Sequence, residues 1–280
     1  MREEFKDLFA EQLSPRQLNS TGSYLPVKGI YSIGWRGWRD LPEADFVASL
    51  TEWHDGFIRE HKGEAFFPLF GQLVQKGELS PEELKQYFEF FASNANLGFY
   101  YEGLAHYRAH LAGLRDIRDL LAWHLFEESG HNEMLADFME GYLKMNRVRE
   151  VYPLMDPLLI KDKNPSSYKR LQRIKLLNAQ GHFVELAAAS ILRERILPKA
   201  HRLINNGLRK EYEVPDKYMQ FFDVHCFIDI YHPRFAQYIL GKYATTKELK
   251  QQAENAFRNA VLGEYENSKK NYERLQVSRR

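Results

Sequence analysis

Apolar residues recur at helical spacing along almost the whole chain, and this periodicity is the feature that most constrains its fold. Helix-start signals accompany it. Asp40, Ser80 and Thr245 each stand three residues before a glutamate, which is the spacing of a capping box. The sequence therefore predicts an all-α protein. We expect helices over residues 2–12, 42–76 (broken at Gly63), 81–111, 115–146, 167–179, 182–208, 216–241 and 246–274.

The length of the chain limits its domain organisation. Its 280 residues suffice for one large domain or two small ones. No polar linker or fixed-period repeat divides the sequence, so a single helical domain over residues 42–280 is the simplest expectation. Residues 14–39 are rich in serine, glycine, proline and aromatic side chains. We therefore predict that residues 1–41 form an N-terminal extension whose aromatic loop packs on the helical domain.

Charge and cysteine content exclude several classes of function. The 39 Lys and Arg residues nearly balance the 38 Asp and Glu residues, so no global field attracts nucleic acid or an anionic membrane. The single cysteine, Cys226, rules out an internal disulfide framework and any cysteine-only metal site. No apolar run approaches the roughly 18 residues of a membrane-spanning helix, and the N-terminus lacks the apolar stretch of a signal peptide. We expect a cytoplasmic protein.

Carboxylates and histidines interrupt the apolar stripes of four predicted helices. At about 100° per residue, each of them falls on the stripe that faces the core rather than on the solvated face. Offsets of three and four residues also keep neighbouring members of a group together on one face. These interruptions are Glu102 and His106 in helix 81–111, His124, Glu128 and His131 in helix 115–146, Glu194 and His201 in helix 182–208, and His225, Asp229 and His232 in helix 216–241.

A buried carboxylate needs a partner, because without one it costs several kcal/mol or becomes protonated. Lys and Arg are largely absent from these stripes. Two divalent ions carry a total charge of about +4, which matches the four carboxylates on the stripes. Imidazole and carboxylate ligands without thiolates favour iron or manganese over structural zinc, and helical bundles commonly host such dinuclear centres. The four carboxylates are Glu102, Glu128, Glu194 and Asp229.

Simpler interpretations exist for each residue taken alone. A lone histidine such as His106, His124 or His201 is more often a hydrogen-bonded histidine than a metal ligand. The pair Glu128 and His131 is also a weak signal by itself, and His106 and His124 remain alternatives to His131. A metal site is favoured only because all four stripes carry ligand-type residues together.

An upstream segment resembles a known family. It contains a histidine at His61, an apolar helix at residues 67–70 and a Gly-x-Leu-Ser-x-Glu helix start at residues 77–84. This order of features resembles that of the haem-oxygenase-like diiron oxidases and oxygenases. These proteins are relatives of the thiaminase-II and pyrroloquinoline-quinone synthase proteins, and the resemblance spans residues 60–241. Metal-free relatives share this segment, so it implies only the fold. That fold is a haem-oxygenase-like bundle of about seven or eight helices.

Later residues resemble the metal ligands of this family. The sequence matches three elements of the family's metal-binding pattern, and one further glutamate resembles an upstream ligand that some members use. The resemblance therefore implies that these residues together bind the metal. The matches are Glu128 with His131, Glu194 in a Glu-x-x-x-Pro element, the His-x-x-x-Asp-x-x-His pattern of His225, Asp229 and His232, and the upstream Glu102.

The resemblance implies a non-haem diiron enzyme that activates O2 and oxidises a small metabolite in a biosynthetic pathway. The expected reaction is N-oxygenation of an amine or amino-acid-like substrate, or oxidative desaturation or carbon–carbon cleavage. The expected cofactors are two Fe(II) ions, with manganese as the second choice. The expected partners are the substrate, O2 and an external electron donor, and a homodimer is a further expectation.

Two other classes of protein compete with this interpretation. The first is a metal-free thiaminase-II-like hydrolase or cofactor-binding relative on the same fold, and it predicts a reactive Cys226. The second is a non-catalytic helical interaction protein in which the acid and histidine clusters are polar networks of the core. Neither class explains why four stripes carry ligand-type residues without Lys or Arg partners.

Overall fold

The computed structural model describes residues 44–61, 66–128, 130–146, 148, 165–226, 229 and 232–278. Every regular element within these ranges is helical, which confirms the predicted all-α class. The predicted helix 2–12 and the predicted extension over residues 1–41 lie outside the described residues. The α-helices are α4 (Asp45–Glu60), α5 (Phe66–Gln75), α6 (Pro81–Leu111), α7 (Arg115–Glu128), α8 (His131–Gly141), α11 (Pro165–Gln180), α12 (Phe183–Leu186), α13 (Leu197–Lys210), α14 (Gln220–His225), α15 (His232–Tyr243) and α16 (Lys247–Ser278).

These helices outnumber the seven or eight predicted from the sequence, because several predicted helices are interrupted. The predicted helix 115–146 breaks after Glu128, where Gly130 precedes α8. The predicted helix 182–208 contains a π segment, Ala187–Ile191, and a 3-10 segment, Leu192–Ile196. The predicted helix 216–241 is divided into α14 and α15, after a 3-10 turn at Asp216–Tyr218. Each irregularity falls next to a predicted ligand.

The capping predictions are confirmed for α6 and shifted by one residue for α16. The side chain of Ser80 accepts a hydrogen bond from the backbone N–H of Glu83 at 3.3 Å, and Glu83 accepts one from the backbone of Ser80 at 2.7 Å. Both bonds satisfy backbone donors of the first turn. In α16 the capping hydroxyl belongs to Thr246, which accepts from the backbone N–H of Leu249 at 3.2 Å.

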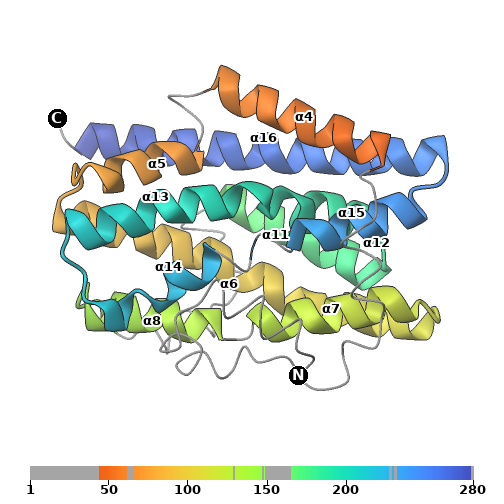
Figure 1. Cartoon of the computed structure of the whole chain (residues 1–280), viewed down its shortest axis with the longest axis horizontal. Coiled ribbons are helices and arrows are strands. Elements are labelled where there is room, and N and C mark those ends of the chain that lie inside the picture. Colours follow the sequence, from red (N-terminus) through yellow and green to blue (C-terminus); the bar gives the residue numbers. More distant parts are fainter. Residues whose placement is uncertain are drawn as a thin grey trace, which may run out of the picture.

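The helices lie roughly along one axis in layers (Figure 1). The long helix α16 runs along one side of the molecule, with α4 packed outside it. Helices α7 and α8 lie on the opposite side, and α13 and α15 lie between these layers. Among the described residues, no helix combines the length and the apolar composition that crossing a membrane requires.

Two large apolar clusters, one toward each end of the bundle, form most of the core of the described residues, beside a third, small cluster of Leu177, Ala189 and Ala256. In the first, Phe88 of α6, Phe138 of α8 and Phe222 of α14 pack edge to face, with ring centroids 4.7 to 5.5 Å apart. The second contains Trp123 of α7 and Phe235 of α15, whose ring centroids are 4.4 Å apart. Because α7, α8, α14 and α15 all end or begin between the two clusters, their terminal side chains meet inside the molecule.

A close contact joins α13 to α5 at Gly207. A Cβ atom at this position would stand 2.3 Å from the carbonyl oxygen of Val74 and 2.6 Å from the Cα of Gln75. Glycine is therefore required here so that the two backbones can approach one another. This contact fixes the position of α13, the helix that follows Glu194.

Candidate metal centre

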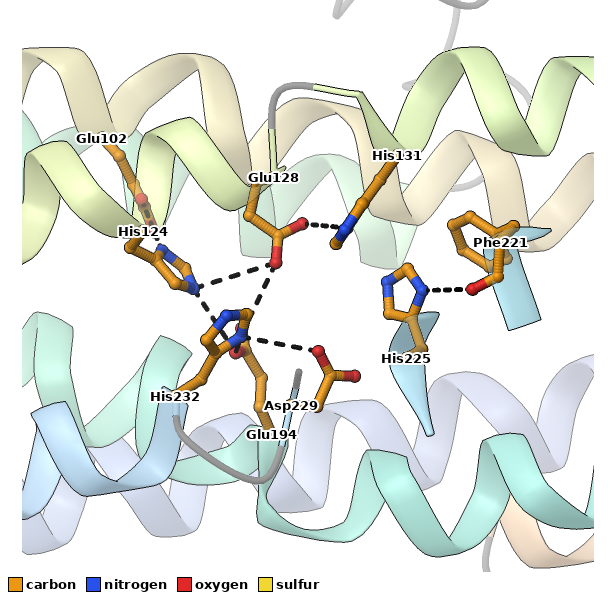
Figure 2. A network of polar contacts seen from close by, with 9 residues as sticks. All are labelled: Glu102, His124, Glu128, His131, Glu194, Phe221, His225, Asp229 and His232. Atoms are coloured by element: carbon orange, nitrogen blue, oxygen red, sulfur yellow. Dashed lines mark hydrogen bonds and ion pairs between the residues drawn. The ribbon is translucent and has the colours of Figure 1, made fainter. Parts of the chain in front are cut away.

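Buried acidic and histidine side chains gather between the two apolar clusters (Figure 2). The structure brings together all seven residues that the sequence predicts as metal ligands. It adds two histidines that the predicted ligand set leaves out, His124 and His201. The alternative His106 lies elsewhere on α6, close to Arg118 and Asp119. The nine residues are Glu102 from α6, His124 and Glu128 from α7, His131 from α8, Glu194 from the 3-10 segment, His201 from α13, His225 from α14, Asp229, and His232 from α15.

Glu128 and His131 do not share one continuous helix, and the predicted helix over residues 115–146 is wrong at this point. Glu128 is the last residue of α7, His131 is the first residue of α8, and Gly130 lies between them. The two side chains nevertheless meet, with 2.8 Å between His131 Nδ1 and Glu128 Oε2. The predicted pairing is therefore correct, although a helix break rather than the i, i+3 spacing of a helix produces it.

Glu194 lies in the 3-10 segment that directly follows the π segment. π segments are rare and concentrate at functional sites, because they change which way the following side chains point. The neighbouring Arg193 and Arg195 pair away from the site, with Glu264 of α16 at 2.5 Å and with Asp55 of α4 at 2.8 Å. These pairs leave Glu194 to face the histidines.

The residues His225, Asp229 and His232 also belong to separate elements. His225 ends α14 and His232 begins α15, so the predicted single helical face does not exist. Their side chains still converge, and His232 Nδ1 lies 3.5 Å from Asp229 Oδ1. The imidazole of His225 donates its Nδ1 proton to the carbonyl of Phe221 at 2.7 Å. This hydrogen bond leaves Nε2 of His225 available as a ligand.

The side chains form two groups that share Glu128. In the first group, His232 Nδ1 lies 2.9 Å from Glu194 Oε2 and 3.6 Å from Glu128 Oε1, and His124 contacts the same two oxygens. In the second group, ligand atoms of Glu128, His131 and His225 all lie within 4.8 Å of one another. His201, His225 and Asp229 satisfy the same limit beside it.

The carboxyl groups of Glu128, Glu194 and Asp229 differ in charge, although burial raises the pKa of each of them. At Glu128 the neighbouring imidazoles outweigh burial and hold the pKa well below its ordinary value. At Glu194 the imidazoles of His124 and His232 lower the pKa to about 2. Asp229 behaves in the opposite way, because burial and the charges of Glu128 and Glu194 keep its pKa well above the ordinary value. Without a cation, Glu128 and Glu194 are therefore ionised and Asp229 is protonated.

The histidines of the site also differ in the direction in which their pKa is shifted. Burial lowers the pKa of His124, but the charges of Glu102 and Glu194 outweigh it and raise the pKa well above its ordinary value. Burial and the neighbouring imidazoles lower the pKa of His225 well below that value. The same causes lower the pKa of His201 to about 3. His225 and His201 are therefore neutral, which is the form that binds a metal ion.

The donor set fits two metal ions. Two buried atoms, His124 Nε2 and Asp229 Oδ2, have no hydrogen-bond partner in the described part of the chain, and such atoms cost about 1–3 kcal/mol each. Ligand atoms about 2.1 Å from one ion lie roughly 3–4 Å apart. Three separations in the first group, of 3.6–3.9 Å, fall in this range, and the fourth, 2.9 Å between His232 Nδ1 and Glu194 Oε2, is a hydrogen bond. The donors are imidazole nitrogens and carboxylate oxygens, the set that favours iron or manganese.

Cys226 is expected to be unreactive in the folded protein. Its side chain is buried, and burial together with the charge of Asp223 raises the pKa of the thiol to about 12. The thiolate fraction at neutral pH is then about a thousandfold lower than that of an ordinary cysteine. We predict that iodoacetamide labels Cys226 in the urea-unfolded protein but not in the native one. Rapid labelling of the native protein would instead support the metal-free hydrolase.

The chain belongs to the haem-oxygenase-like family of iron-containing redox enzymes. The sequence profile of this family matches residues 91–265, a segment that contains all nine residues of the site. This match confirms the resemblance found in the sequence and gives the class of protein, an iron-containing redox enzyme with an all-helical fold. Comparisons with curated proteins and with solved structures gave no match.

Proposed function

We propose that the chain is a non-haem diiron enzyme that uses O2 to oxidise a small metabolite. The observation that carries this proposal is the position of Glu128 between two histidine-containing groups of ligand atoms. Oε1 of Glu128 faces His124 and His232, and Oε2 faces His131. In this position each oxygen of Glu128 would help to hold an ion together with the histidines that it faces.

The charge of the site supports two divalent ions. Glu102 adds a fourth buried acid through its hydrogen bond to His124, so the acids together balance a charge of about +4. Within the described residues, the two arginines that flank Glu194, Arg193 and Arg195, pair with Glu264 and Asp55 instead of with the acids of the site. The proposed ligands are Glu128, His131, Glu194, His225, Asp229 and His232.

The surrounding residues orient the ligands and exclude water. Iron(II), when bound here, supplies the electrons that reduce O2. Trp123 and Phe221 pack against the histidines of the two groups, with ring centroids 6.0 Å from His232 and 4.1 Å from His225. The Phe221 carbonyl holds a proton at His225 Nδ1, so that His225 Nε2 faces the site. Excluding water strengthens every charge interaction within the site.

The proposed substrate is a small amine or amino-acid-like molecule, which undergoes N-oxygenation, desaturation or carbon–carbon cleavage. A two-electron oxidation of the substrate supplies only half of the electrons that reduce O2 to water. An external electron donor is therefore part of the proposal. Manganese is the second choice of metal, because the same oxygen and nitrogen ligands accept it.

Anaerobic reconstitution with Fe(II) tests this proposal. We expect about two irons per chain, O2 consumption on mixing with air-saturated buffer, and a transient visible absorption band. Asp229→Ala and Glu194→Ala are expected to lose iron and the band, while Asp137→Ala, which removes an exposed acid of α8, keeps both. A folded wild-type protein that binds no iron, or only one, would contradict the diiron proposal.

A further inference from the structure

His124 stands one helical turn before Glu128 on α7 and faces the proposed centre (Figure 2). It is 3 % exposed, and its ring lies edge to face with that of His232, with centroids 4.3 Å apart. Its Nδ1 lies 2.7 Å from Oε2 of the buried Glu102. Its Nε2 lies 3.6 Å from Glu194 Oε2 and 3.9 Å from Glu128 Oε1. One ring nitrogen is therefore held by a carboxylate, and the other points at the proposed ligands.

The hydrogen bond to Glu102 determines which nitrogen of His124 carries the proton. A carboxylate oxygen accepts hydrogen bonds, so Nδ1 of His124 donates to Glu102. Nε2 then faces the oxygens of Glu128 and Glu194, and its lone pair would be offered to an ion bound beside them. Histidines that bind metals commonly donate their other ring N–H to a carboxylate in this way, which fixes the ring and raises its basicity.

The distances at Nε2 are longer than that of the hydrogen bond at Nδ1. A charged N–H···O hydrogen bond is about 2.7–2.9 Å long, as the bond at Nδ1 is. The separations at Nε2, 3.6 and 3.9 Å, are longer by about 0.7–1.2 Å. Ligand atoms that share one ion lie at such separations.

We propose that His124 is an additional ligand of the ion held by Glu128, Glu194 and His232, and that Glu102 positions His124 rather than binding metal itself. This inference rests on the proposed diiron function. It replaces the prediction from the sequence that Glu102 is a ligand, and it gives the first ion two imidazoles. Glu102 is thus a positioning residue that acts through His124.

Anaerobic Fe(II) titration of four variants and the wild type tests this assignment. His124→Ala is expected to bind one iron per chain instead of two. Glu102→Gln is expected to retain two irons, with the affinity of one of them lowered about 10–100-fold, as for the loss of a supporting carboxylate. The matched controls are His182→Ala and Glu185→Gln, because this more exposed pair also joins a histidine Nδ1 to a glutamate Oε2, at 2.9 Å. Both controls should bind two irons with wild-type affinity.

A second set of variants keeps the test decisive if His124→Ala fails to fold. His124→Phe combined with Glu102→Leu keeps an aromatic ring at position 124 and removes both partners of the 2.7 Å hydrogen bond, so that neither is left unpaired. It is expected to fold and to bind one iron. In His124→Gly, added imidazole is expected to restore the second iron, which a purely structural role of His124 would not allow.

The outcomes separate this inference from the function on which it rests. If the wild type binds two irons and His124→Ala also binds two with unchanged affinity, the inference is wrong and the diiron function stands. Complete loss of one iron in Glu102→Gln would likewise overturn it, because Glu102 would then be the ligand. If the folded wild-type protein binds no iron, both the function and the inference fail.

Discussion

The variant Glu128→Gln is expected to lose both irons. Among substitutions in the site that keep the size and shape of the side chain, we expect it to have the largest effect. One oxygen of Glu128 faces His124 and His232, and the other contacts His131 at 2.8 Å. A neutral amide would remove the negative charge that the two proposed ions share, and it would place a hydrogen-bond donor where one of them would bind. We therefore expect less than about half an iron per chain after anaerobic reconstitution.

Thermal unfolding provides a second measurement of the same variant. Fe(II) at about 100 times its dissociation constant stabilises a folded protein by about 2.7 kcal/mol. That is the effect of one filled site, and for a chain of this size each filled site corresponds to a rise in Tm of roughly 5–10 °C. The rise is expected in the wild type and in the control Glu133→Gln, which changes an exposed glutamate of α8. Its absence in Glu128→Gln, with an apo Tm close to that of the wild type, would confirm that the loss is one of binding. Retention of both irons would refute the bridging role.

Helical periodicity and capping predicted the helices of this fold well where tertiary contacts do not disturb them. The predicted helix 81–111 has the bounds of α6, because Ser80, Pro81 and Glu83 specify its start locally. The breaks at Gly130 and between His225 and His232 were not predicted. They depend on how side chains from different helices meet, and that information is not local in sequence.

The location of the site was predictable for a different reason. A carboxylate that faces the core needs a cation or a hydrogen-bond donor beside it, whether or not its helix is continuous. Glu128, Glu194 and Asp229 were therefore expected to lie close to such partners, and they do. What each partner does was not predictable. Position on the stripe shows that Glu102 and His124 are buried, but only the structure shows that they contact each other at 2.7 Å.

Gly207→Ala is expected to destabilise the protein by about 2–3 kcal/mol or more, although alanine is the better helix former by about 1 kcal/mol. The added methyl group would stand 2.3 Å from the Val74 carbonyl oxygen, and neither backbone can yield without separating α13 from α5. The matched control is Gly263→Ala on α16, where a Cβ atom meets nothing within 4 Å. Only the gain in helix propensity remains there, so this control is expected to stabilise by up to about 1 kcal/mol.

Urea unfolding of the metal-free proteins measures both effects, and their opposite signs exclude a general effect of replacing glycine.

The result also shows whether α5 belongs to the same cooperative unit as the helices of the site. Val74 lies in α5, outside the residues 91–265 that match the family, whereas Gly207 lies within them. A large loss of stability in a single cooperative transition would show that α5 unfolds together with the matched segment. If Gly207→Ala were as stable as Gly263→Ala, α5 would instead be dispensable for the helices that hold the site.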